Sequence, residues 1–172
     1  IDVLFHPILS VTREGAKLRS VSPGKGEGKL VESYVFIQLE QMLTSDACRK
    51  LVSALENTFA DVRAAMERQG LKESDIKQGD AIFFNTGWGA LWMKNNDRFN
   101  AGEPGIGLEV AKWIVTKLPA LVGADTWGTE VVPNPDKNLA FPVHGELITK
   151  NGIFNHENLV FDELIKDRKY QF

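Results

Sequence analysis

The sequence predicts a single-domain α/β protein. From residue 44 onward, segments with helical and strand patterns alternate along the chain, and this alternation is typical of α/β folds. The 172 residues suffice for one domain with a proper core. Short apolar runs at 34–39, 81–85 and 120–124 have the composition of buried strands, and AIFFN at 81–85 is expected to be central.

The helices are predicted from caps and apolar spacing. Ser45 is expected to cap a helix that runs to about residue 56, and Thr58 a second one that ends at Gly70. Residues 108–117 form an amphipathic pattern with Trp113 in the core. Residues 141–150 read as a short helix, followed by a glycine break at Gly152 and a strand.

Three segments are expected to be less regular. Residues 1–11 have strand-like composition, and the polar, glycine-rich stretch 12–32 is predicted to be a surface loop, because it lacks a phosphate-binding GxxxxGK[ST] pattern. Residues 91–107 are irregular and aromatic, which indicates a lid or a pocket wall. Trp92 lies in this segment.

Composition excludes several classes of protein. The net charge of -3 gives no electrostatic reason to expect nucleic acid or an anionic membrane as a partner. The single cysteine, Cys48, excludes an internal disulfide framework and suits a reducing, cytoplasmic location. No apolar run approaches the roughly 20 residues of a membrane span. The chain begins with Ile, so we expect a processed product or a fragment.

Polar and aromatic residues follow two of the predicted strands. TGWG at 86–89 follows one strand, with Trp88 at its centre, and Asp125, Thr126 and Trp127 follow another. Because parallel strands deliver their carboxyl ends to one edge of a sheet, these residues suggest one shared site. The TGWG segment is equally consistent with a hydrophobic plug at the end of the sheet.

A histidine and a carboxylate in the stretch 141–159 are the main chemical candidates. The predicted reversal of the chain at Gly152 can bring His144 and Glu157 together. Imidazole and carboxylate are ligands of zinc and manganese, but catalytic zinc usually has three protein ligands. The residue types leave open a metal half-site or a satisfied polar pair. His156 is expected to point away from Glu157, because neighbours on a strand face opposite sides.

Four consecutive blocks resemble the C-terminal half of the cyclase family, which includes kynurenine formamidase and isatin hydrolase. They are GDAIFFNTGWGALW, EPGIGLEVAKWI, LVGADTWGTEVVPNP and FPVHGELITKNGIFNHENLVFDEL. The resemblance covers about residues 58–172. It implies an α/β domain with a mixed, partly closed sheet flanked by helices, assembled as an oligomer. It also implies a zinc or manganese centre that activates water against an amide or lactone carbonyl.

The resemblance carries roles onto particular residues. In the family, the histidine that begins the HxxL helix and the glutamate of the EN(L) strand bind the metal, and they match His144 and Glu157. The TGW and DT segments line or support the pocket, which implicates Trp88, Asp125 and Thr126, with Trp92 and Trp127 as further pocket candidates.

The chain departs from the family pattern in its N-terminal part. The family's HxGTHxDxPxH motif, which supplies most of the metal ligands, is not present. We therefore divide the chain into an atypical N-terminal segment, 1–57, and a cyclase-like half, 58–172. We expect a small-molecule hydrolase that is incomplete or impaired as this chain. The alternative is a non-catalytic binding or assembly module whose aromatic loop takes an aromatic small molecule or a partner subunit.

Overall fold

The computed structural model describes residues 10–12, 15–17, 34–39 and 56–172. The strands are β1 (Ser10–Thr12), β2 (Gly15–Lys17), β3 (Tyr34–Gln38), β4 (Glu56–Asn57), β5 (Ala81–Asn85), β6 (Gly105–Ile106), β7 (Leu121–Ala124) and β8 (Phe154–His156). The helices are α1 (Phe59–Arg68), α2 (Asn96–Asn100), α3 (Leu108–Lys117), α4 (Pro142–His144) and α5 (Asp162–Asp167), with 3₁₀ turns at Glu73–Asp75 and Trp88–Leu91 and a π-helical turn at Gly145–Lys150.

The main sheet has the strand order β3-β5-β7-β8, and all three strand pairings are parallel. Val35 on β3 adds an antiparallel bridge to Gln171 near the C-terminus. The pairs β1–β2 and β4–β6 form two small separate sheets. The predicted α/β class is therefore confirmed, and so are the predicted strands at 34–39, 81–85 and 120–124.

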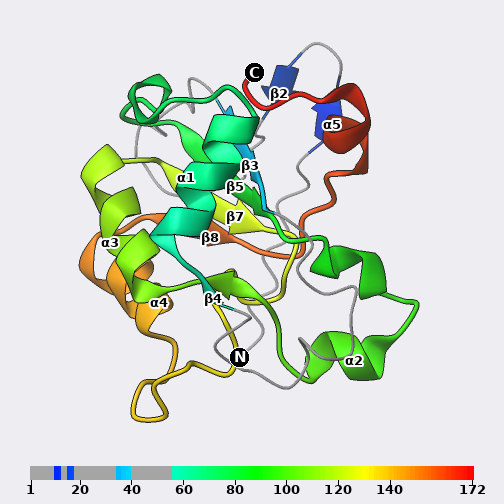
Figure 1. Ribbon diagram of the computed structural model, residues 1–172, viewed down its shortest axis with the longest axis vertical. Coiled ribbons are helices and arrows are strands. Elements are labelled where there is room, and N and C mark those ends of the chain that lie inside the picture. Colours follow the sequence, from blue (N-terminus) through cyan, green and yellow to red (C-terminus); the bar gives the residue numbers. More distant parts are fainter. Residues whose placement is uncertain (1–9, 13–14, 18–33, 40–55) are drawn as a thin grey trace, which may run out of the picture.

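Both faces of the sheet are covered (Figure 1). One set of alternating side chains, including Ile37, Phe84 and Val122, packs in one core with α1, α3 and the α4 region. The other set, including Phe36 and Phe83, packs against α5 and the C-terminal segment. Because the central strands β5 and β7 are buried on both sides, their sequences are apolar rather than alternating.

The predicted cap at Thr58 is confirmed. The Thr58 hydroxyl accepts from the Asp61 backbone N–H at 3.3 Å, and the Asp61 carboxylate accepts from the Thr58 N–H at 2.8 Å. Such a reciprocal capping box is typically worth about 1 kcal/mol. Trp113 was expected in the core and is only partly buried, because its indole N–H reaches outward to Glu73 at 3.0 Å.

The segment 91–107 is more regular than the sequence predicted. It contains α2 and β6, and the Asn95 side chain caps α2 by accepting from the Arg98 N–H at 3.1 Å. Most of the predicted helix from Ser45 to about residue 56, with Cys48, and most of the predicted loop 12–32 lie outside the described residues. Glu56, at the predicted end of that helix, belongs to strand β4. None of the helices in the described ranges is long and apolar enough to cross a membrane.

Candidate metal centre

The structure brings His144 and Glu157 together. His144 is the last residue of α4, and Glu157 directly follows β8. The His144 Nε2 atom lies 3.1 Å from Glu157 Oε1. A π-helical turn begins immediately after His144, and such turns are frequent at functional sites. The sequence predicted this convergence, and the role of the pair as metal ligands stays a prediction.

Glu130 holds the other side of the His144 ring. Its Oε1 accepts from the His144 backbone N–H at 2.9 Å and lies 2.5 Å from Nδ1, while Oε2 accepts from the Val143 N–H at 3.2 Å. The hydrogen bond to Glu130, followed by the one to Glu157, raises the pKa of His144 to about 9. His144 is thus protonated at neutral pH in the metal-free chain. Burial instead lowers the pKa of His156.

Asn155 joins this group from β8. Its side-chain amide donates to Glu157 Oε1 at 2.9 Å, and its Oδ1 accepts from the Thr129 hydroxyl at 2.7 Å. The roles of Glu130, Thr129 and Asn155 were not predicted. Thr129 and Glu130 were recognisable only as polar residues after a strand, and the sequence around Asn155 contains no signal for its position.

The His144–Glu157 contact is a hydrogen bond, so the pair is satisfied without a metal, and its length is also compatible with two ligands of one metal ion. Two ligands bound at 2.0–2.1 Å in a tetrahedral site lie about 3.3 Å apart, close to the observed 3.1 Å. Within the described ranges, no group of three or more His, Cys, Asp or Glu side chains is arranged to hold a metal. The reason is that Glu130 faces Nδ1, on the far side of the ring from Nε2, so only two groups converge.

Asp125 ties the ends of β5 and β7 together. Its Oδ1 accepts from the Thr86 N–H at 2.7 Å and the Thr86 hydroxyl at 2.9 Å, and Oδ2 accepts from the Gly89 N–H at 3.1 Å. A Cβ on Gly89 would lie 2.9 Å from the Asp125 carbonyl oxygen, so this loop requires glycine. Thr126 is completely buried. These contacts show a structural role for Asp125, and its predicted place in a substrate pocket stays a prediction.

The three predicted pocket tryptophans gather around α2. The indole N–H groups of Trp88 and Trp127 both donate to the Phe99 carbonyl, at 3.3 and 3.1 Å. The Trp92 ring lies 5.2 Å from the Phe99 ring. Trp88 and Phe99 are buried, whereas Trp92 is 54% exposed. Trp92 is therefore the member of this aromatic cluster (Trp88, Trp92, Phe99 and Trp127) with the most surface for a ligand.

Glu103 is a completely buried carboxyl group that the sequence did not single out. Its Oε2 accepts from the Trp127 N–H at 2.7 Å, while Oε1 has no hydrogen-bond partner in the described part of the chain. Burial is the main cause that raises the pKa of Glu103 to about 8, and the charges of Glu157 and Asp125 add to it.

Glu103→Gln is expected to stabilise the fold increasingly as pH rises. The raised pKa means that folded Glu103 keeps a proton that the unfolded chain releases, so the wild type loses stability from about pH 4.5 through 8. Gln removes that loss, and a gain of ~1 kcal/mol would raise Tm by about 2–4 °C in a chain of this size. Thermal unfolding at pH 5 and pH 8 measures the difference. The exposed Glu109→Gln on α3 is the control, and an unchanged difference across pH would contradict the expectation.

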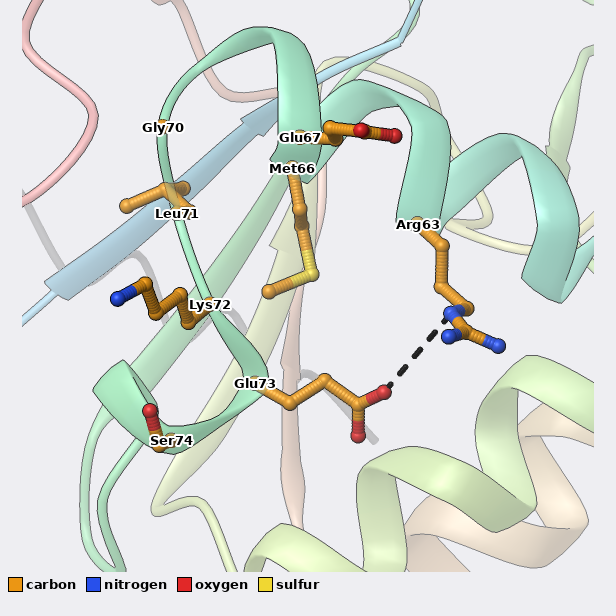
Figure 2. Close-up of a pocket in the computed structure, with 8 residues that line it drawn as sticks. All are labelled: Arg63, Met66, Glu67, Gly70, Leu71, Lys72, Glu73 and Ser74. Carbon is orange, nitrogen blue, oxygen red and sulfur yellow. Dashed lines mark ion pairs between the residues drawn. The ribbon is translucent and has the colours of Figure 1, made fainter.

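A shallow groove lies between the end of α1 and the following 3₁₀ turn (Figure 2). Glu73 at this groove is 4.0 Å from Arg63 and 3.0 Å from the Lys117 ammonium. Hydrogen bonds from Trp113 and Lys117 lower the pKa of Glu73. The groove is thus the edge of an ion-pair network, and no predicted site residue lines it. Its lining residues are Arg63, Met66, Glu67, Gly70, Leu71, Lys72, Glu73 and Ser74.

The described chain thus combines a parallel α/β sheet with a histidine–carboxylate pair next to its edge strand β8. The chain belongs to the cyclase family, since residues 26–131 match that family's model, described as "Putative cyclase". The match includes residues 26–57, upstream of the stretch in which the resemblance was recognised, and strand β3 in this part belongs to the main sheet. His144 and Glu157 lie beyond the matched segment. The division of the chain at 57/58 stays a prediction.

Solved structures share the fold. A crystal structure described as a novel cyclase is 25% identical with a TM-score of 0.61, covering 81% of this chain and 45% of that chain. Isatin hydrolase A from Ralstonia solanacearum is 20% identical with a TM-score of 0.55, covering 77% of this chain and 49% of that one. Isatin hydrolase A from Labrenzia aggregata, bound to benzyl benzoate, is 17% identical with a TM-score of 0.55, covering 76% and 49%.

The chain spans about half the length of these structures. None of the curated proteins matches it in sequence. The likeness to the isatin hydrolases, at 20% and 17% identity, establishes the shared fold alone.

Proposed function

We propose that this chain carries half of the active site of a hydrolase that uses zinc or manganese to cleave a small amide or lactone. The observation that carries the proposal is the convergence of His144 Nε2 and Glu157 Oε1 at 3.1 Å beyond the edge strand β8. Family membership and the fold shared with isatin hydrolases agree with it. Two ligands hold a metal weakly, so the chain alone is expected to have little turnover.

The residues of the chain have separate tasks in this proposal. His144 presents Nε2 and Glu157 presents Oε1 to the metal. Glu130 accepts a hydrogen bond from His144 Nδ1 and so keeps Nε2 facing Glu157, while Asn155 donates a hydrogen bond to the Glu157 carboxylate. A bound metal would lower the pKa of water and polarise the substrate carbonyl. Trp92, as the exposed member of the aromatic cluster, is placed to contact an aromatic substrate.

The test is hydrolysis of N-formylkynurenine, isatin and simple lactones with added Mn²⁺ or Zn²⁺, together with metal binding by the same preparation. We expect measurable metal binding with little turnover. Clear hydrolysis that a chelator abolishes would show that the chain is active rather than impaired. If the chain bound neither metal at millimolar concentration, the proposal would be wrong.

Metal affinity is expected to rise with pH. Below its pKa of about 9, His144 carries a proton that the metal must displace. The affinity should therefore increase about tenfold per pH unit between pH 7 and 9, with one proton released per ion. Mn²⁺ titrations followed by electron paramagnetic resonance from pH 6.5 to 8.5 measure the slope. A flat profile would mean that His144 does not bind the metal.

A second candidate function is binding of an aromatic small molecule without catalysis. The supporting observation is the 54% exposed Trp92 ring, 5.2 Å from Phe99. Quenching of tryptophan fluorescence by isatin, lost in Trp92→Ala, would support this function. Elemental analysis after gentle purification discriminates the two candidates, because near-stoichiometric metal favours the hydrolase.

We also propose that the chain forms a dimer or a larger assembly. Phe154 on the edge strand β8 is 76% exposed, and Phe141 beside His144 is 47% exposed. Large exposed apolar side chains at a strand edge favour association. Light scattering at micromolar concentration measures the mass, and a clean monomer would contradict the proposal.

A further inference from the structure

The backbone at Thr129 has an unfavourable conformation. Its φ is 58°, a region that β-branched residues rarely occupy. The Gly128 carbonyl accepts from the Glu130 N–H at 2.5 Å, which closes a γ-turn around Thr129. A γ-turn with positive φ is rare and strained, and such strain persists only where surrounding contacts impose it. Thr129 and Glu130 are both 1% exposed, so the turn is held inside the fold.

The Thr129 side chain is linked to Glu157 through Asn155. The Thr129 hydroxyl donates to Asn155 Oδ1 at 2.7 Å. This bond fixes which end of the Asn155 amide faces the site, so the NH₂ group is directed to Glu157 Oε1, at 2.9 Å. Removing the hydroxyl leaves Asn155 Oδ1 without this donor and loosens the amide that donates to Glu157 Oε1.

The Glu130 side chain contacts His144 directly. Glu130 accepts from His144 at both the backbone N–H and Nδ1, and from the Val143 N–H. These contacts fix the start of α4 and the rotation of the imidazole ring together. Because Nδ1 is engaged by Glu130, Nε2 is the ring nitrogen left to face Glu157.

We propose that the strained turn at Thr129–Glu130 is a positioning element that aligns both predicted metal ligands before any metal binds. This inference rests on the proposed function for its purpose, but the alignment itself is a property of the metal-free chain. Two adjacent residues reach two ligands from separate elements because the positive φ at Thr129 turns their side chains toward α4 and β8. Neither residue touches the metal in this scheme.

The test uses nuclear magnetic resonance of the metal-free chain at pH 7. The wild type should show a downfield Nδ1 proton of His144 and slow hydrogen exchange of the Asn155 side-chain amide. Glu130→Gln should move the His144 Nδ1 proton signal upfield, because a neutral amide oxygen accepts a weaker hydrogen bond than a carboxylate does, and the Gln NH₂ group would face the Val143 N–H. Thr129→Val should accelerate hydrogen exchange of the Asn155 side-chain amide at least tenfold, and Thr129→Ser should restore slow exchange. If Thr129→Val does not fold, Thr129→Ala removes the same hydroxyl and keeps the Asn155 amide as the probe.

Metal affinity supplies a second readout. Glu130→Gln and Thr129→Val should each weaken Mn²⁺ or Zn²⁺ binding about 10–100-fold, the usual effect of losing a residue that orients a ligand. The control is Thr116→Val on α3, which removes an exposed hydroxyl bond to the Trp113 carbonyl within the same helix. Equal exchange rates and affinities in Thr129→Val and Thr116→Val would overturn the inference. If the wild type binds no metal, the proposed function fails while the resonance measurements still decide the positioning role.

Discussion

Replacing His144 with Gln is expected to reduce Mn²⁺ and Zn²⁺ binding at least ~100-fold, to the background level of the chain. The imidazole Nε2 is one of two groups that converge in the candidate centre. A Gln side chain offers only a neutral amide oxygen, a much poorer ligand for these metals than imidazole. The substitution also removes the hydrogen bonds that link Glu130 and Glu157 through the ring.

The matched control for this experiment is His156→Gln. His156 lies next to Glu157 in sequence, on β8, and burial lowers its pKa, so it resembles His144 in type but not in surroundings. Competition with a chromophoric chelator measures the affinities, and circular dichroism checks that both variants fold. If His156→Gln weakened binding as much as His144→Gln, the assignment of His144 as the ligand would be wrong.

Replacing Asp125 with Ala is expected to destabilise the fold by about 3–5 kcal/mol. Two buried donors on Thr86 and a partly buried donor on Gly89 direct their protons to the Asp125 carboxylate. Removing it leaves these donors without an acceptor, and each unsatisfied buried group costs about 1–3 kcal/mol. The connection between the ends of β5 and β7 is lost at the same time.

Urea unfolding of the variant measures this loss, with Asp136→Ala as the control. Asp136 also accepts backbone and side-chain hydrogen bonds, from Asn138 at 2.9 and 3.0 Å, but it is exposed. Its replacement should cost no more than ~1 kcal/mol, because water satisfies the donors. A loss in Asp125→Ala as small as that in Asp136→Ala would show that the Asp125 contacts are not required for stability.

The sequence predicted the central strands β5 and β7 well, because burial on both faces requires uninterrupted runs of apolar residues. Runs such as AIFFN have no polar interruption, and few structures other than a central strand accommodate them. The Thr58 cap was predictable for a similar reason, since both halves of the capping box are local. The short helix α2 was missed because Asn95 caps only a single turn, which has no measurable apolar period.

The candidate site was predictable only in part. His144 and Glu157 stood out by residue type and by the family resemblance. Glu130 and Asn155 did not, because their roles depend on contacts made across the fold. Glu130 reaches α4 from the loop after β7, and its position depends on a positive φ at Thr129 that threonine does not favour. No local pattern of residues encodes such a turn.

The parallel arrangement of the sheet also has a consequence for folding. Tyr34 pairs with Ala81, Ala81 with Leu121, and Leu121 with Phe154, so every strand must find a neighbour several dozen residues away. Chains dominated by such distant pairings fold slowly, because closing the long loops costs conformational entropy before the stabilising contacts form. His144 lies in the crossover between β7 and β8, and Glu157 follows β8. The His144–Glu157 pair therefore forms only when β8 has joined the sheet.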